Sequence, residues 1–505
     1  MSEDILAKIV RMRREDIERL GLNFGIEIPE KREVGHTEFL GNAGAILEVK
    51  RASPSKGDIA PDLDPVGLAT TYAEAHAQAV SVLTETNFFK GMLRDLIAVA
   101  NLMESRRKQG LHACAVLRKD FLLFEDEIDI AYRCGADAVL LIARILDDEQ
   151  LVRMAKRAAS FDMQAFVEVR ETDDLRKLKV VTDALGDAAA KTIVAGVNSR
   201  DLATFHTDPL VPASVRSKLP AKAVFESGIL CPADATYARN LGFTGILVGE
   251  AVAKNPPLAK EVVHAFESGS ENARGKFWKK FAERKAAKKA GPLVKICGIT
   301  RDEDGKLAAE LGADMLGFVF STTKRLTTEE FVRSFAEKMR LCHPEQAQRV
   351  KGSPLLVGVI TDPESVEGKT AIKLAKEGVL DAVQFHGVAP GAEFSDLPHY
   401  GAARVGEESD FDKVTALRKS GEPRILLDAK VEGIPGGTGK TIPENLLREK
   451  AGDLPLWLAG GITPENVGAI VEKFHPELVD VSSGVEDAPG IKNSEKLKAL
   501  FAALS

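Results

Sequence analysis

The sequence predicts an α/β protein made of two tandem (β/α)8 barrels, also called TIM barrels. Its 505 residues exceed what one hydrophobic core usually organises, so two domains of about 250 residues are expected. Short apolar runs rich in β-branched residues recur with helical stretches between them, as in a parallel sheet built from alternating strands and helices. Many runs are apolar throughout, as expected of strands buried on both faces.

The apolar runs fall into two sets of eight along the chain. The first set lies at residues 45–49, 79–85, 113–119, 138–143, 164–169, 192–198, 223–228 and 245–250. The second set lies at residues 293–297, 315–320, 355–360, 382–386, 402–406, 424–429, 456–460 and 478–484. Because eight strand–helix units close one barrel, we expect a first barrel within residues 1–265 and a second within residues 292–505.

Two segments fall outside the strand pattern. Residues 266–291 are polar, then rich in lysine and alanine, which predicts a charged helical linker with a solvated face rather than a surface for membranes or nucleic acid. Ahead of the first strand, residues 2–40 predict extra helices that cap the first barrel by core packing. Their apolar residues at roughly helical spacing are Ile5, Ile9, Met12, Ile17 and Leu20.

Composition and charge exclude several classes of protein. Hydrophobic residues make up 44% of the chain and charged residues 28%, which suits a globular protein with a large core. The formal charge of -7 is mild and argues against a dedicated nucleic-acid binder. No apolar run approaches the roughly 18 residues of a membrane-spanning helix, and the first residues lack the apolar core of a signal peptide. We therefore expect a cytoplasmic protein without membrane or nucleic-acid partners.

Charged and polar residues gather at the carboxyl ends of the strands of the first barrel, where reactive groups lie in this fold. Each one alone is equally well explained as a structural ion pair. Together they point to proton transfer, because burying carboxylates beside lysines costs desolvation energy that apolar residues would not incur. The residues are Glu48, Lys50, Lys119, Glu168, Asn198 and Glu226.

Three glycine-containing segments follow strands of the first barrel: SPSKG after the first, ESG at the seventh and VGE at the eighth. Glycine lets the backbone approach an anion closely, and a following helix presents free amide donors. Any one of these segments is weak evidence, but strands seven and eight are the usual phosphate position in this fold. A phosphorylated ligand is therefore expected.

Several motifs of the first half occur in an order and spacing that resembles indole-3-glycerol-phosphate synthase: EVKRASPSKG, SVLTETNFFKG, VLRKDF, GADAVLLI, FVEV, GVNSRDL, ESGI and LVGE. The resemblance spans about residues 1–265. It implies decarboxylation and ring closure of carboxyphenylamino-deoxyribulose phosphate, with release of carbon dioxide and water. It also implies Lys119 as general acid and Glu168 as base, with Lys50 holding the departing carboxylate. Whether Lys50 or Lys119 donates the proton stays open at this point.

The same resemblance assigns further residues of the first barrel. Glu48, Asn198 and Glu226 would orient the hydroxyls and the developing iminium charge, and Phe89 would stack on the anthranilate ring. Arg200 matches a site residue of the family, although a strand-end ion pair explains it nearly as well. The implied phosphate cradle comprises Ser53, Ser227, Gly228, Gly249 and Glu250.

Cysteine usage singles out one residue of the second barrel. Most cysteines in apolar strands are inert, but Cys297 ends the strand at 293–297 before Gly298, where cations and amides can favour a thiolate. Its partner would be Asp428 at the end of the sixth strand, unless that residue caps a helix. The segment GGTGK at 436–440 lacks P-loop spacing, so ATP is not implied. The five cysteines lack CxxC spacing, so neither a disulfide nor a zinc site is expected: Cys114, Cys134, Cys231, Cys297 and Cys342.

The motifs KICGIT, VQFHG, LLDA…GGTGK, LAGGITPENV and DVSSGVE-x-x-PG-x-K resemble phosphoribosylanthranilate isomerase across about residues 292–505. The resemblance implies an Amadori rearrangement that produces the substrate of the first barrel. Asp428 would be the acid and Cys297 the base, so neither metal nor cofactor is needed. Arg325 would hold the anthranilate carboxylate and His386 would line the site, unless it is a structural histidine. The implied phosphate site comprises Gly460, Gly461, Ser483 and Gly484.

The second half departs from the family pattern at two places. It reads Thr323-Lys324-Arg325 where the family has Ser-Pro-Arg, and Lys492-Asn493 where the family has Lys-Asp. The first change puts the shape of the loop in doubt, because the arginine is kept, and the second lies outside the proton-transfer pair.

Three hypotheses follow from the two halves: two working enzymes, one enzyme with a sugar-phosphate-binding relic, or a non-catalytic pair that only binds sugar phosphates. Fold alone does not separate them. Acid–base groups and glycine loops persist in both halves, which favours two working enzymes. We expect a monomer whose partners are its phosphorylated substrates, and nothing in the sequence indicates an association with tryptophan synthase.

Overall fold

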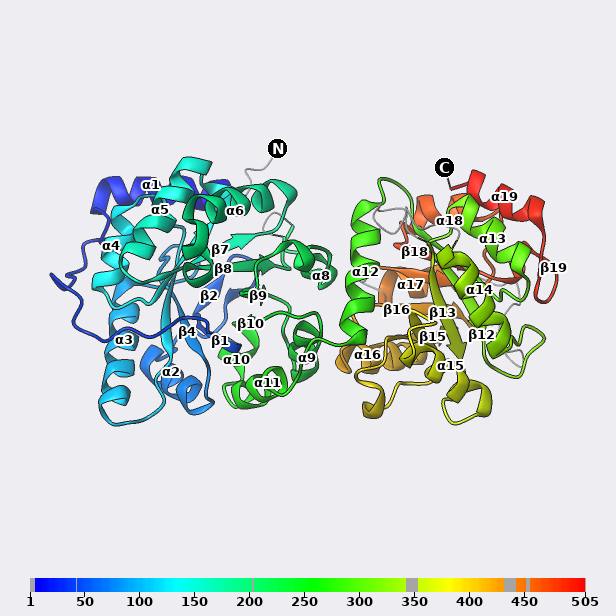
Figure 1. The fold of residues 1–505 in the computed structure, drawn as a ribbon. Coiled ribbons are helices and arrows are strands. Elements are labelled where there is room, and N and C mark those ends of the chain that lie inside the picture. The colour runs from blue at the N-terminus through cyan, green and yellow to red at the C-terminus, as the bar shows by residue number, and fades with distance from the viewer. Residues whose placement is uncertain are drawn as a thin grey trace. The chain divides into compact units, whose positions relative to one another are not determined.

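The computed structural model describes residues 5–41, 43–201, 204–341, 353–430, 442–450 and 455–504. The chain divides into two compact units, Met1–Glu271 and Asn272–Ser505. Each unit contains a closed barrel of eight parallel strands with helices around it (Figure 1). The prediction of two tandem (β/α)8 barrels is therefore confirmed.

The first barrel closes because β1 pairs with both β10 and β4. Its strands occupy the eight predicted apolar runs, since β-branched side chains suit a sheet buried on both faces. They are β1 (Gly44–Val49), β4 (Ala79–Leu83), β5 (Ala115–Lys119), β6 (Ala138–Ile142), β7 (Gln164–Val169), β8 (Ile193–Asn198), β9 (Ala223–Glu226) and β10 (Gly245–Val248). A short antiparallel pair, β2 (Ala52–Ser53) and β3 (Gly57–Asp58), follows β1.

Helices of the first unit surround this barrel (Figure 1). They are α1 (Ile5–Leu20), α2 (Pro65–Glu74), α3 (Leu93–Lys108), α4 (Asp126–Arg133), α5 (Asp148–Ser160), α6 (Thr172–Leu185), α7 (Ala189–Thr192), α8 (Leu210–Val215), α9 (Pro232–Asn240), α10 (Glu250–Lys254) and α11 (Leu258–Glu267), with 3-10 turns at Ala143–Ile145, Gly186–Ala188 and Arg216–Lys218. Among the described residues of the whole chain, no helix is both long enough and apolar enough to span a bilayer.

Helix α1 covers the mouth of the first barrel. Leu6 and Ile9 are buried in the same apolar cluster as Leu140 and Ile142 of β6. The predicted core packing is therefore present at Ile9, whereas Leu20 is 39% exposed. On the next turn, Arg13 is buried and its guanidinium lies 2.7 Å from Asp120, the residue after β5; it also pairs with Glu127. The helix is therefore anchored to the segment that directly follows a site strand.

The second barrel is closed in the same way, since β11 pairs with both β12 and β18. Its strands are β11 (Leu293–Cys297), β12 (Met315–Val319), β13 (Leu355–Ile360), β14 (Ala382–His386), β15 (His399–Val405), β16 (Ile425–Ala429), β17 (Trp457–Ala459) and β18 (Leu478–Val481). A small antiparallel pair, β19 (Glu486–Ala488) and β20 (Ile491–Lys492), follows β18.

The helices of the second unit are α12 (Ala273–Ala287), α13 (Asp302–Leu311), α14 (Glu329–Leu341), α15 (Val366–Lys376), α16 (Phe411–Lys419), α17 (Glu444–Lys450), α18 (Val467–Phe474) and α19 (Ser494–Ala502), with 3-10 turns at Ala392–Phe394, Glu408–Asp410 and Ser483–Val485. Polar side chains mark several helix starts by accepting backbone N–H bonds, as helix-capping residues do. Ser365 accepts from Gly368 before α15, and Asn272 accepts from Gly275 in α12.

Helix α12 corrects the prediction of a solvated linker over residues 266–291. Residues up to Glu267 belong to α11, while α12 packs against the second barrel through fully buried Trp278 and Phe281. The Phe281 ring lies 4.7 Å from that of Trp457 in β17, measured between centroids. Arg274 adds a buried ion pair of 3.0 Å with Glu422. Although this segment is rich in lysine, one face of the helix is apolar, and that face is part of the core of the second barrel.

Candidate active sites

The first barrel has a pocket at the carboxyl ends of its strands. The predicted proton-transfer residues line it from four strands, with Lys50 directly after β1; they are Glu48, Lys50, Lys119, Glu168 and Asn198. Glu226 lies deeper, with 1% of its surface exposed, and reaches the pocket through its contact with Lys119. The structure therefore brings all six residues together.

Lys119 lies between two carboxylates. Its ammonium nitrogen is 3.2 Å from Oε2 of Glu48 and 3.3 Å from Oε2 of Glu226. The ammonium nitrogen of Lys50 is 3.2 Å from the other oxygen of Glu48. Glu48 thus bridges the two lysines, whereas Glu226 pairs with Lys119.

The pKa values of these groups are driven apart. Burial disfavours the Glu48 carboxylate, but the charges of Lys119 and Lys50 outweigh burial and lower the pKa of Glu48 to about 2. Burial and the neighbouring Glu168 carboxylate raise the pKa of Glu226 to about 8. Burial also raises the pKa of Glu168, despite the opposing charge of Lys119 and a hydrogen bond with Asn198. Burial alone would lower the pKa of Lys119, but the three surrounding carboxylates outweigh burial and raise it. The pocket therefore holds a charged lysine beside Glu226, a carboxyl group that keeps a proton near neutral pH.

An apolar wall faces these charges. Phe89 lines the pocket, with the ammonium of Lys50 5.5 Å from its ring centroid. Glu85 holds the loop in place by accepting the N–H groups of Asn87, Phe88 and Phe89. The sequence does not single out the remaining apolar lining as site residues: Ile5, Leu6, Ile9, Pro54, Leu83, Phe121, Leu140, Ile142 and Phe205. The helical spacing of Ile5 and Ile9 was visible, but it predicted only core packing.

The predicted phosphate residues of the first barrel divide into two groups. Ser53, Arg200 and Ser227 line the pocket, together with Ser55, which was not predicted. Gly228, Gly249 and Glu250 are not among its lining residues. A Cβ atom at Gly249 would lie 2.6 Å from Oε1 of Glu48, so this glycine makes room for the carboxylate.

Arg200 combines its two predicted roles. Its guanidinium lines the pocket, donates to the Ser55 hydroxyl at 3.4 Å, and lies 4.0 Å from the carboxylate of Glu250. Glu250 itself pairs with Lys254 at 2.7 Å. The strand-end ion pair and the position at the pocket are therefore compatible.

The second barrel has its own pocket at the corresponding end. All predicted residues that the structure describes line it: Cys297, Arg325, His386, Asp428, Gly460, Gly461, Ser483 and Gly484. The GGTGK segment at 436–440 and Cys342 lie outside the described residues. Cys297 and Asp428, which end β11 and β16, thus share one cavity.

A hydrogen-bonded series holds Asp428 in place. Lys295 and Tyr400 both donate to Oε1 of Gln384, at 2.7 and 2.9 Å, which fixes the orientation of its amide. The Gln384 amide nitrogen then donates to Nδ1 of His386 at 3.1 Å. Because Nδ1 accepts this hydrogen bond, the ring proton lies on the other nitrogen, Nε2, which is 3.3 Å from Oδ2 of Asp428. His386 therefore lines the pocket in contact with Asp428.

Several polar residues in or next to this pocket were missed from the sequence; besides the three described next, its lining includes Ser321, Thr361, Arg404 and Ser482. Lys295 is fully buried and pairs with Asp480 at 2.5 Å, and Gln384 and Asp480 line the cavity. A signal was present, because Lys295 and Gln384 each stand two residues before a predicted site residue on the same strand, so their side chains share its face. A charged residue inside an apolar strand was the available clue.

Cys297 does not rest as a thiolate. Burial raises the pKa of its thiol, and the nearby ammonium groups of Lys295 and Lys492 offset this only in part. The expectation that neighbouring cations favour the thiolate is therefore corrected: desolvation of the anion is the larger effect.

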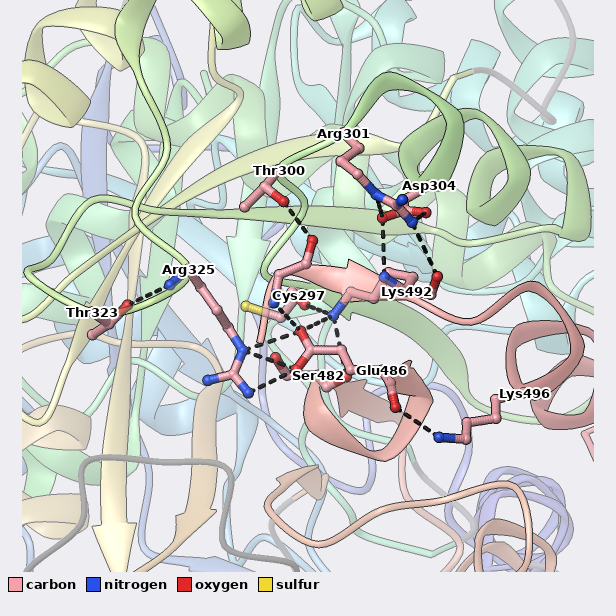
Figure 2. Close-up of polar contacts among 11 residues, drawn as sticks. Cys297, Thr300, Arg301, Asp304, Thr323, Arg325, Ser482, Glu486, Lys492 and Lys496 are labelled. Carbon is pink, nitrogen blue, oxygen red and sulfur yellow. Dashed lines mark hydrogen bonds and ion pairs between the residues drawn. The ribbon is translucent and has the colours of Figure 1, made fainter. Parts of the chain in front are cut away.

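At both positions that depart from the family pattern, the residue present has a local structural role. The Thr323 hydroxyl accepts the N–H of Arg325 at 3.2 Å, so the loop is closed by a hydroxyl (Figure 2). The Asn493 side chain accepts the N–H groups of Glu495 and Lys496 at 2.8 and 2.9 Å and thereby caps α19. Aspartate would cap the helix in the same way.

Comparison with known proteins matches both halves. Residues 7–265 match the family model of indole-3-glycerol phosphate synthase, and residues 294–503 match that of N-(5'phosphoribosyl)anthranilate (PRA) isomerase. The tryptophan biosynthesis protein TRP1 of Phytophthora nicotianae is 30% identical over 554 residues, which covers 99% of this chain and 96% of that protein. An indole-3-glycerol phosphate synthase of Roseiflexus is 40% identical over 221 residues, 43% of this chain and 78% of that one.

A multifunctional tryptophan biosynthesis protein of Schizosaccharomyces pombe is 33% identical over 485 residues, which covers 91% of this chain. The chain spans only 59% of that relative's length. Two barrels, two pockets and two matching family models agree in their order along the chain. The chain therefore belongs to the indole-3-glycerol phosphate synthase family through its first barrel, and carries a PRA isomerase domain as its second.

Proposed function

We propose that this chain catalyses two consecutive steps of tryptophan biosynthesis. The second barrel would isomerise N-(5-phosphoribosyl)anthranilate to 1-(2-carboxyphenylamino)-1-deoxyribulose 5-phosphate. The first barrel would then decarboxylate, cyclise and dehydrate that ketose to indole-3-glycerol phosphate. The observation that carries the proposal is that each barrel has a separate pocket with its own proton-transfer groups.

The rearrangement in the second barrel needs an acid and a base. Asp428 would protonate the ring oxygen of the aminated ribose and so open the furanose, while His386 holds its carboxyl group in position. Cys297, as the thiolate, would take the proton from the neighbouring carbon to give the enol, which becomes the ketose. Protons and electrons balance within the substrate, so the step is an internal oxidation and reduction.

The first barrel would form a carbon–carbon bond between the aromatic ring and the ketose carbonyl carbon. Lys119 would protonate the carbonyl oxygen, and the carboxylate held by Lys50 would leave as carbon dioxide. Glu168 would then take a proton from the ring carbon next to the nitrogen, while the new hydroxyl accepts a proton from the Lys119 ammonium, restored by Glu226, and leaves as water, which yields the indole ring. Asn198 would keep the Glu168 carboxyl in place through their hydrogen bond.

The contacts favour Lys119 over Lys50 as the proton donor. Lys119 pairs with Glu226, whose pKa of about 8 lets it carry a proton at neutral pH and restore the ammonium. Lys50 pairs with Glu48, whose pKa of about 2 leaves it no proton to give. Lys50 would therefore act through its charge.

We also propose that the chain is a cytoplasmic monomer whose partners are its phosphorylated substrates. The formal charge of -7 supports the part of this proposal that excludes a nucleic-acid partner, because the chain has no excess of cationic residues to bind phosphates. The competing reading, one working barrel beside a sugar-phosphate-binding relic, predicts a pocket that has lost its acid–base groups. Both described pockets keep theirs.

An assay of the purified chain with N-(5-phosphoribosyl)anthranilate tests both halves at once. Formation of the ketose and then of indole-3-glycerol phosphate is the expected result. Accumulation of the ketose alone would identify the first barrel as the relic. If the substrate is not consumed but added ketose is converted, the second barrel is the relic. Turnover of neither compound would refute the proposal.

The pH dependence of the isomerisation follows from Cys297. An ordinary cysteine has a pKa of about 8.5. Because burial raises the pKa of the Cys297 thiol, its thiolate fraction grows with pH but is still incomplete at pH values where an ordinary cysteine is largely ionised. We expect kcat/KM for isomerisation to rise with pH and to be still rising at about pH 9. Initial rates measured from about pH 6 to about pH 10 check this; a plateau reached below neutrality would contradict it.

A further inference from the structure

Glu486 lies between two cations at the edge of the second pocket. Its carboxylate accepts from Nε of Arg325 at 3.1 Å and from Nη2 at 2.8 Å, and it also pairs with the Lys492 ammonium at 2.8 Å (Figure 2). The Glu486 side chain is 4% exposed. None of these contacts belongs to the proton-transfer chemistry described above.

Lys492 ties this cluster to Cys297. Its side chain is fully buried, and the nitrogen donates to the backbone oxygens of Cys297 and Ser482, at 2.5 and 3.1 Å, as well as to Glu486. An ammonium has three hydrogens to donate, so all of its donors are used. Lys492 therefore joins the ends of β11 and β18 at the residue that would act as base.

Arg325 is held along one edge and open along the other. Figure 2 shows its third nitrogen, Nη1, directed away from Glu486, and no described residue accepts a hydrogen bond from it. The side chain lies across Gly298, where an added Cβ would be 2.8 Å from Cδ of Arg325. The guanidinium thus stands next to Cys297 with a free donor at the pocket it lines.

The charges leave one positive charge for a ligand. Arg325 and Lys492 contribute two, and the Glu486 carboxylate removes one. Burial opposes ionisation of Glu486, but the two cations outweigh burial and lower its pKa, so the carboxylate is ionised at neutral pH. One net positive charge beside the base suits a substrate that carries a single aromatic carboxylate there.

We propose that Glu486 is a positioning residue that aims Arg325 at the carboxylate of the substrate. By fixing the Nε edge of the guanidinium, it leaves the Nη1 side for the ligand. By balancing Lys492, it allows that lysine to stay buried and to hold the backbone of Cys297. This inference rests on the proposed isomerase function and adds the residue that determines recognition of the carboxylate.

The substitution Glu486→Gln tests this role with two inhibitors. Both are reduced, phosphorylated open-chain amino sugars; one carries a 2-carboxyphenyl group and the other a phenyl group. We expect the wild-type chain to bind the carboxylated compound with the lower Kd. Glu486→Gln should reduce the ratio of the two Kd values about tenfold, as expected for loss of a charge-assisted contact. The KM for isomerisation should rise by a similar factor, with a smaller fall in kcat. Equal weakening of both inhibitors, or no change, would overturn the proposal.

Two further variants keep the test interpretable. Glu486→Asp keeps the charge on a shorter side chain and should recover part of the preference for the carboxylated inhibitor. If this variant folds and recovers none of that preference, the proposed positioning role of Glu486 is wrong. Glu495→Gln removes a carboxylate that is 79% exposed on α19 and should leave the preference unchanged. A comparable loss in that variant would overturn the specific role of Glu486.

The proposed function fails separately from this inference. If the wild-type chain does not isomerise the substrate, the proposed function falls. If the wild-type chain does and Glu486→Gln keeps the full inhibitor preference, only the role of Glu486 falls. Synthase activity of the same preparations, followed with added ketose, reports that the first barrel is folded.

Discussion

Replacing Lys119 with alanine is expected to abolish formation of indole-3-glycerol phosphate while isomerisation in the second barrel continues. The change removes the proposed proton donor and leaves Glu48 and Glu226 without the cation between them. Loss of a general acid commonly costs about 10²–10⁴ in rate, so we expect at least a hundredfold fall. The measurement is a pair of assays on one preparation, one with the ketose and one with N-(5-phosphoribosyl)anthranilate.

A matched control for this variant is Lys90→Ala. Lys90 carries the same charge on a loop of the same barrel, but its side chain is 49% exposed and pairs with Asp58 rather than with a buried carboxylate. Its removal should leave synthase chemistry largely intact. Loss of both activities in Lys119→Ala would argue against two independent sites, and full synthase activity would exclude Lys119 as the acid.

Replacing Cys297 with alanine is expected to have the opposite effect. The proposed base of the isomerase disappears, so kcat for isomerisation should fall by about 10²–10⁴. Conversion of added ketose to indole-3-glycerol phosphate should persist, because that chemistry belongs to the other pocket. Cys297→Ser is the isosteric companion, and it should also be impaired, since a hydroxyl ionises far less readily than a thiol.

Cys231→Ser provides the comparison for a cysteine outside the pockets. Cys231 forms no disulfide within the described residues and is only partly buried, at the start of α9. This variant should retain both activities. An active Cys297→Ala chain would show that another group takes the proton, and the assignment of the base would be withdrawn.

The positions of the site residues were predictable because the fold supplies them. Apolar runs mark the strands, and parallel strands of a closed barrel end at one mouth, so Glu48, Lys119 and Glu168 had to converge. The sequence predicts the fifth strand of the second barrel at 402–406, yet β15 begins at His399. A histidine and a tyrosine do not resemble a buried strand start, but Glu422 contacts the His399 ring at 2.8 Å and makes its burial possible.

Contacts between residues distant in sequence set the limit of the prediction. The aromatic face of α12 was hidden among lysines, because only Trp457 and Tyr400, more than a hundred residues later, show what that face covers. Arg325 was expected to hold a ligand carboxylate, and nothing local indicated that Glu486 would hold one edge of its guanidinium. Residue spacing reports which side chains share a face, but not which charges neutralise each other.

In both barrels a glycine on the adjacent strand stands beside a reactive side chain. A methyl group at Gly196 would come 2.2 Å from Oε1 of Glu226, and one at Gly317 would come 2.7 Å from the sulfur of Cys297. These two positions carry no chemistry of their own. Because neither glycine has a side chain, each reactive group has room for its observed position, so an alanine there would displace that group and lower one activity while leaving the other intact. Inherited variation at these sites would split the two activities of a single gene.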